Sequence, residues 1–92
     1  MTETRETMIK RMRMRSMRRG IKEMDLILSD FATRQLDAMS DDGLVQYDAL
    51  LRENDHDLYA WIGGTGAVPD EFAALVAQIR AGATGLTSPT VA

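Results

Sequence analysis

The chain has 92 residues, contains no cysteine and only one histidine, and carries a formal net charge of −3 at pH 7. This length allows one domain with a small core and leaves little room for a deep substrate pocket. The missing cysteines exclude disulfides, thiolate metal sites and a cysteine nucleophile, and a single histidine excludes a multi-histidine metal site. No apolar run approaches the roughly 20 residues of a membrane-spanning helix. We therefore expect no metal site and no membrane span.

Charge is divided unevenly along the chain. Residues 1–20 carry seven basic and two acidic side chains, a sum of +5, whereas residues 21–92 carry four basic and twelve acidic ones, a sum of −8. A protein that binds nucleic acid through most of its surface would be basic over a much larger part of its length. We therefore expect no nucleic-acid partner.

A first helix is predicted over residues 5–19. One of its faces combines apolar side chains and a serine at helical spacing: Met8, Ile9, Met12 and Ser16. Three arginines, spaced four and three residues apart, form a separate basic stripe: Arg11, Arg15 and Arg18. We expect Gly20 to end this helix, because glycine readily adopts the left-handed conformation that follows helix C-termini.

Four further helices are predicted, and no segment has the pattern of a strand. The second covers residues 21–36. The third begins at Ser40, whose hydroxyl can cap the first turn. The fourth is the short apolar stretch at residues 57–62, and the fifth begins at Val68 and Pro69, because proline suits the first position of a helix.

These elements predict an all-α fold, a small antiparallel five-helix bundle. One helical domain is expected over residues 1–80, followed by a flexible C-terminal tail over residues 81–92. We also expect a monomer. The predicted core consists of the apolar side chains that share helical faces: Met24, Leu28, Phe31, Leu44, Tyr47, Leu51, Leu58, Trp61, Phe72, Leu75, Val76 and Ile79.

Few side chains could carry chemistry. His56 could act as a general base, but it lies between two aspartates that favour a helix-entry loop, and it has no partner histidine or cysteine. The glycine-rich stretch at residues 63–66 lacks the lysine and the serine or threonine of a phosphate-binding loop, so we interpret it as the turn that ends the fourth helix. The sequence therefore predicts no catalytic residue and no bound cofactor.

The basic first helix could contact nucleic acid, an anionic membrane or a protein, or it could simply be solvated. Its apolar face is narrow and has no aromatic residue, which disfavours a membrane. Its methionines are flexible and suit a protein contact, which we favour. The alternative is a small regulatory, antitoxin-like protein that binds a toxin or DNA through this helix.

The motif Arg19-Gly20-x-x-Glu23 lies where the first two predicted helices meet. It can be explained locally by a capping glycine, an arginine near a helix C-terminus and a carboxylate near a helix N-terminus. A glycine at a tight corner also allows another backbone to approach. The flanking arginine and glutamate could then offer donors and acceptors to one partner.

With this motif, the stretch RRGIKEMDLIL resembles the Arg-Gly-x-x-Glu signature of the succinate dehydrogenase FAD-assembly factors of the SdhE type, also named antitoxin CptB. A second stretch, LLRENDHDLYAWIGG at residues 50–64, is similar to the aspartate, the Asp-Leu-Tyr-x-Trp sequence and the glycine found downstream in this family. The two motifs have the expected order and spacing. The resemblance covers roughly residues 11–79.

The resemblance implies a bacterial cytoplasmic protein that binds the flavoprotein subunit of succinate dehydrogenase, and in some bacteria that of fumarate reductase. It would promote covalent attachment of FAD to a histidine of that subunit while binding no cofactor of its own. The resemblance also implies a protein that is not itself an enzyme. The partner-contacting positions that carry over from the first motif are Arg19, Gly20 and Glu23. Asp55, Tyr59 and Trp61 match the second motif with a mixed structural and contact role, and of these Asp55 and Tyr59 are predicted to contact the partner. The basic stripe of Arg11, Arg15 and Arg18 is added as a further predicted partner contact.

Overall fold

The computed structural model describes residues 3–83, and all regular secondary structure within them is helical. Its α-helices are α1 (Arg5–Arg15), α2 (Lys22–Gln35), α3 (Asp41–Leu50), α4 (Asp55–Gly63) and α5 (Ala73–Ala83), with short 3-10 turns at Leu36–Ala38 and Asp70–Phe72. The predicted all-α fold with five helices is therefore confirmed. None of the helices described is long and apolar enough to cross a membrane.

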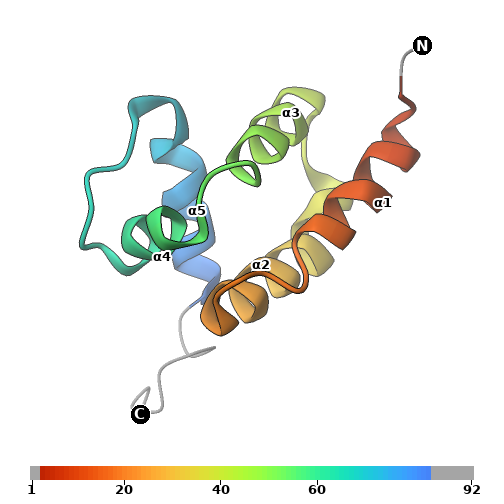
Figure 1. Cartoon of the computed structure of the whole chain (residues 1–92). Helices are drawn as coiled ribbons and strands as arrows, with labels where there is room; N and C mark the ends of the chain where they lie inside the picture. The colour runs from red at the N-terminus through yellow and green to blue at the C-terminus, as the bar shows by residue number, and fades with distance from the viewer. Residues whose placement is uncertain (1–2, 84–92) are drawn as a thin grey trace.

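Helix α2 lies at the centre of the bundle and packs against α1, α4 and α5, while α3 packs against α1. In Figure 1, α1 descends from the N-terminal end to the loop before α2, and α2 then runs back beside it. This arrangement follows from the apolar face of α2, on which Met24, Ile27, Leu28 and Phe31 are all buried. A helix with such a face is stable only when neighbouring helices cover it.

Every side chain of the predicted core is buried. The largest of them pack as aromatic pairs, Phe31 with Tyr47 at a centroid distance of 5.2 Å and Trp61 with Phe72 at 6.1 Å. The core also includes side chains that the prediction omitted: Ile9, Met12, Ile27, Ala32, Leu36, Leu50 and Ile62. Ile9 and Met12 are the buried residues of α1, so this helix contributes little apolar area to the core.

The first helix ends earlier than predicted, at Arg15 instead of Arg19. The buried Ser16 hydroxyl donates to the Met12 carbonyl at 2.8 Å and meets the Tyr47 hydroxyl at 2.7 Å. Arg18, not Gly20, then adopts the left-handed conformation, with φ of 54°. This conformation is unfavourable for a residue with a side chain; here the Arg18 backbone N–H donates to Asp25 at 2.8 Å.

Other helix ends agree more closely with the sequence. The Ser40 hydroxyl accepts from the Gly43 N–H at 3.0 Å, as its predicted capping role requires. Gly64 ends α4 in the left-handed conformation, with φ of 83°. The Asn54 side chain caps the start of α4, which lies two residues before the predicted start of this helix. At the other end, α5 continues to Ala83, through residues that were predicted to belong to the tail; residues 84–92 of that predicted tail lie outside the described part of the chain.

Candidate functional site

The loop that joins α1 to α2, residues 16–21, is the point where the two sequence motifs meet; we call it the corner. Asp55, in the first turn of α4, accepts a hydrogen bond from Arg19 Nε at 2.8 Å with one carboxylate oxygen. Its other oxygen accepts from the Gly20 backbone N–H, also at 2.8 Å. One carboxylate therefore fixes both a side chain and the backbone of the corner.

The Arg19 guanidinium is engaged within the chain. Its side chain is only 10% exposed, and its Nη1 donates to the carbonyls of Arg15 at 2.9 Å and Leu51 at 3.2 Å. Together with the ion pair to Asp55, these bonds tie the corner to the end of α1, to the end of α3 and to α4. Arg19, predicted as a partner contact, is thus placed as an internal anchor of the corner.

Gly20 is needed for a different reason from the one predicted. It does not end a helix, since α1 has already ended at Arg15. A Cβ at this position would lie 3.0 Å from the Asp55 carboxylate oxygen, a separation tighter than ordinary van der Waals contact. Glycine therefore allows the carboxylate to reach the backbone N–H, and it leaves the exposed corner without a side chain.

Glu23 is the acidic residue of the motif that remains available. It is half-buried in the first turn of α2, and within residues 3–83 its carboxylate forms no ion pair or hydrogen bond.

Tyr59 is 45% exposed on α4 and lies one turn after Asp55, so both are on one side of that helix. Leu26, one turn after Glu23, is 47% exposed. Leu26 was not among the predicted site residues. It could have been recognised as an apolar residue that lies off the buried face of α2.

The three arginines of the predicted basic stripe differ in whether they are paired within the chain. Arg11 binds the Asp48 carboxylate in a bidentate manner, at 2.8 and 3.0 Å, and it also pairs with Glu3. The Asp48 side chain is only 10% exposed, so this ion pair fixes α1 to α3. Arg15 and Arg18 are exposed, and their side chains form no ion pair within the described residues. Only these two arginines of the stripe are therefore available to a partner.

Acidification is expected to weaken the fold through Asp48. The hydrogen bonds from Arg11 hold the pKa of the Asp48 carboxyl below its usual value, which is about 3.9 in an unfolded chain. The stabilisation is therefore fully present at neutral pH and is lost as the pH falls below about 4. Asp48→Asn should lower the free energy of unfolding at pH 7 and reduce its decline towards pH 2, as measured by urea unfolding. The exposed Asp42→Asn is the control, and equal declines for the parent and Asp48→Asn would contradict this role.

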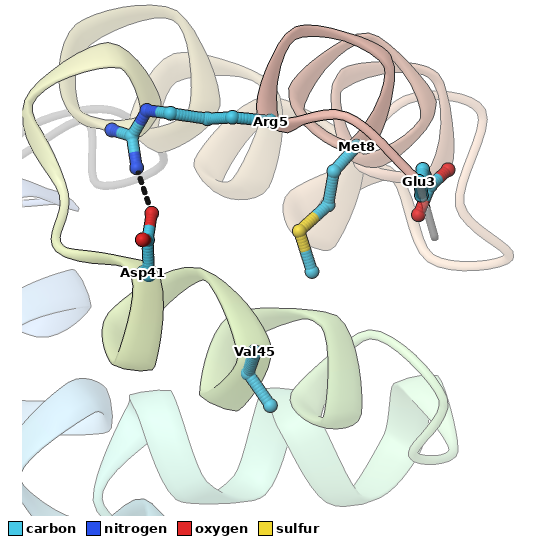
Figure 2. Close-up of a pocket in the computed structure, with 5 residues that line it drawn as sticks. All are labelled: Glu3, Arg5, Met8, Asp41 and Val45. Atoms are coloured by element: carbon cyan, nitrogen blue, oxygen red, sulfur yellow. Dashed lines mark hydrogen bonds and ion pairs between the residues drawn. The ribbon is translucent and has the colours of Figure 1, made fainter. Parts of the chain in front are cut away.

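A pocket of about 380 Å³ lies between α1 and α3, at the opposite end of α1 from the corner. In Figure 2, Met8 extends from α1 towards α3, the helix that carries Val45. Arg5 and Asp41 form an ion pair of 2.7 Å at one side of it, and Glu3 completes the lining. None of the predicted site residues lines this pocket, so we place the candidate site at the corner.

The described residues do not assemble a metal site, since no group of three acidic or histidine side chains among them could hold an ion. His56 is exposed, and its backbone N–H donates to Asn54 in the cap of α4. The corner offers a hydrogen-bonded backbone with an exposed glycine. The helices next to it carry Glu23, whose carboxylate has no bonding partner within residues 3–83, and the exposed side chains of Leu26 and Tyr59. Fold and site together define a small helical protein with a candidate docking surface at the corner.

The chain belongs to the family described as flavinator of succinate dehydrogenase, whose model matches residues 10–83. Both motifs of the earlier resemblance lie inside this range, and the resemblance is thereby confirmed. The corner is thus the meeting point of two segments that this family model covers.

Several curated proteins are similar to the chain. Succinate dehydrogenase assembly factor 2, mitochondrial, is 52% identical over 59 residues in Meyerozyma guilliermondii and 41% identical over 70 residues in Schizosaccharomyces pombe, covering 64% and 76% of this chain. The FAD assembly factor SdhE of Legionella pneumophila is 38% identical over 63 residues, which are 68% of this chain and 80% of that protein. The chain spans about half the length of the two fungal relatives, 44% and 50% respectively.

The prediction of a bacterial cytoplasmic protein is wrong in the light of these similarities. The relatives from M. guilliermondii, S. pombe and Saccharomyces cerevisiae are fungal proteins whose names place them in mitochondria. The two sequence motifs could not reveal this, because they concern residues that meet at the corner and carry no information about the compartment.

Proposed function

We propose that the chain is an assembly factor that binds the flavoprotein subunit of succinate dehydrogenase and promotes covalent attachment of FAD to that subunit. Membership of the flavinator family over residues 10–83 supports this function. The structural observation that carries it is the corner itself, in which Asp55 holds Arg19 and Gly20 at 2.8 Å and leaves Glu23 free. The flavoprotein of fumarate reductase is proposed as a second client.

The corner would act by orientation. The chain binds its client as a monomer, holds no cofactor of its own and is not an enzyme. It favours the client conformation in which the histidine to be modified lies against the flavin, because it binds that conformation more tightly. Correct positioning of two reacting groups can lower a barrier by several kcal/mol, up to about 7–11. A rigid corner suits this task, since a mobile loop would lose conformational entropy on binding.

The direct test is a reconstitution with the purified flavoprotein subunit of succinate dehydrogenase, free FAD and this chain. Covalent flavin is measured by fluorescence of the flavoprotein band after denaturing electrophoresis. We expect a higher rate and yield of covalent flavin with the chain than without it. Equal yields with and without the chain, at concentrations that saturate binding, would refute the proposed function.

Glu23→Ala should weaken binding of the flavoprotein subunit about tenfold to thirtyfold, as expected for the loss of one hydrogen bond to a charged group. The fold should be nearly unaffected, because within the described residues the Glu23 carboxylate has no bonding partner. Titration calorimetry gives the affinity, and thermal unfolding followed by circular dichroism verifies the fold. Glu71→Ala, which removes an exposed carboxylate from the turn at Asp70–Phe72, is the matched control. Unchanged binding by Glu23→Ala would remove Glu23 from the site.

A further inference from the structure

The cations of the chain are not equally available to a partner. Most arginines pair with carboxylates of the same chain: Arg5, Arg11, Arg13, Arg19, Arg34 and Arg52. Within residues 3–83 the cations that form no ion pair are Lys10, Arg15, Arg18, Lys22 and Arg80. All of these except Arg80 lie in the last half of α1, in the corner or at the start of α2. The cations without an ion pair are therefore concentrated between residues 10 and 22.

Two exposed methionines lie among these cations. Met14 is 66% exposed and Met17 is 47% exposed, whereas Met12 and Met24 are fully buried. Lys10, Met14 and Met17 are spaced by four and three residues, so they follow one another along the outer side of α1 and its final turn. Arg18 comes next and leads into the corner. We call Lys10, Met14, Met17 and Arg18 the basic methionine surface.

We propose that the basic methionine surface binds an acidic segment of the client flavoprotein that also presents an apolar side chain. This inference rests on the proposed function. The unpaired cations select for negative charge, because a like-charged segment would be repelled. The flexible methionine side chains can adapt to and bury an apolar neighbour. The surface continues directly into the corner, so one client could contact both.

A protein segment fits this surface better than an anionic membrane does. The surface carries no aromatic anchor, and its two exposed methionines offer little apolar area for insertion between lipids. The remainder of the chain, residues 21–92, carries a net charge of −8 and would be repelled by anionic headgroups. An acidic segment of limited length can instead contact the positive region without approaching the acidic helices.

The first test neutralises two cations that have no internal partner. The double variant Lys10→Gln/Arg18→Gln is compared with the parent and with Arg80→Gln, which removes an unpaired cation outside the surface. Binding to the purified flavoprotein subunit is measured by titration calorimetry at 50 and 200 mM salt. We expect the double variant to bind about three- to tenfold more weakly at 50 mM salt and to lose much of the salt dependence, as rim charges do. An affinity and a salt dependence equal to those of the parent would overturn the inference.

The second test identifies the occupant. A photo-crosslinking benzoylphenylalanine replaces Met14, and in a control protein it replaces Val45, which is 59% exposed on α3. The crosslinked flavoprotein peptide from position 14 should be rich in aspartate and glutamate, and position 45 should not yield that peptide. A basic or uncharged peptide at position 14, or the same peptide from both positions, would refute an acidic occupant.

A vesicle experiment separates the membrane alternative. The parent chain should not sediment with phosphatidylserine vesicles at 100 mM salt. Sedimentation of the parent that is lost in Lys10→Gln/Arg18→Gln, combined with unchanged flavoprotein binding, would assign the surface to lipid instead. Failure of the parent itself to bind the flavoprotein would refute the proposed function, whereas normal parent binding with unchanged variant binding refutes only the present inference.

Discussion

Trp61→Ala is expected to lower the free energy of unfolding by about 3–5 kcal/mol, the range for loss of a large buried aromatic side chain. Trp61 is 9% exposed and packs against Phe72 at a ring-centroid distance of 6.1 Å. Its removal would leave a cavity between α4 and the start of α5. A small domain has a total stability of about 5–15 kcal/mol, and one of this length is expected near the lower limit, so the variant should be partly unfolded at 37 °C.

Urea unfolding followed by circular dichroism measures this effect without depending on the fluorescence of the deleted tryptophan. Tyr59→Ala serves as the control, because Tyr59 is an aromatic residue of the same helix but is 45% exposed. Its unfolding midpoint should remain close to that of the parent. A Trp61→Ala midpoint equal to that of the parent would show that the indole contributes little to the core.

Asp55→Ala is expected to cost about 2–3 kcal/mol of unfolding free energy and to lower flavinylation of the client. The change removes the acceptor of two hydrogen bonds at 2.8 Å and leaves the Arg19 guanidinium, which is 10% exposed, without its counter-charge. An uncompensated, largely buried charge is costly. The value stays below the range for fully buried pairs because the Asp55 side chain is 21% exposed.

Asp57→Ala is the matched control for this variant. Asp57 is exposed, lies in the same first turn of α4 and forms no ion pair within the described residues. Asp55→Asn adds a second comparison, since an amide oxygen can still accept from the Gly20 N–H while the charge is lost. We expect its stability to lie between those of the parent and Asp55→Ala. If Asp55→Ala unfolds at the same urea concentration as Asp57→Ala, the carboxylate does not hold the corner.

These variants divide the Arg-Gly-x-x-Glu motif into parts with different roles. The sequence favoured Arg19, Gly20 and Glu23 as one partner-contacting surface. That hypothesis stays a prediction for Arg19 and Gly20 as partner contacts, although their bonds to Asp55 also give both residues a role in the fold. It stays a prediction for Glu23, whose carboxylate has no partner in the described part of the chain. We expect Arg19, Gly20 and Asp55 to position the corner and Glu23 to contact the partner.

The sequence by itself determined the five helices and the larger part of the core. Helical periodicity is a local property, so the spacing of Met24, Leu28 and Phe31 was enough to identify the buried face of α2. The cap at Ser40 and the left-handed Gly64 were likewise predictable, because each depends on bonds within one turn of the chain.

Only the tertiary structure decided which polar groups are used internally. Asp55 lies 35 residues from Gly20, and Asp48 lies 37 residues from Arg11. No local pattern shows that these carboxylates meet those partners. The early end of α1 has the same origin, since Ser16 is bonded to Tyr47 of α3. The sequence alone does not show whether a charged side chain is already paired with another residue of the same chain. The packing of α1, α3 and α4 around the corner pairs Arg11 and Arg19 within the chain, whereas the side chains of Arg18 and Glu23 form no ion pair within residues 3–83.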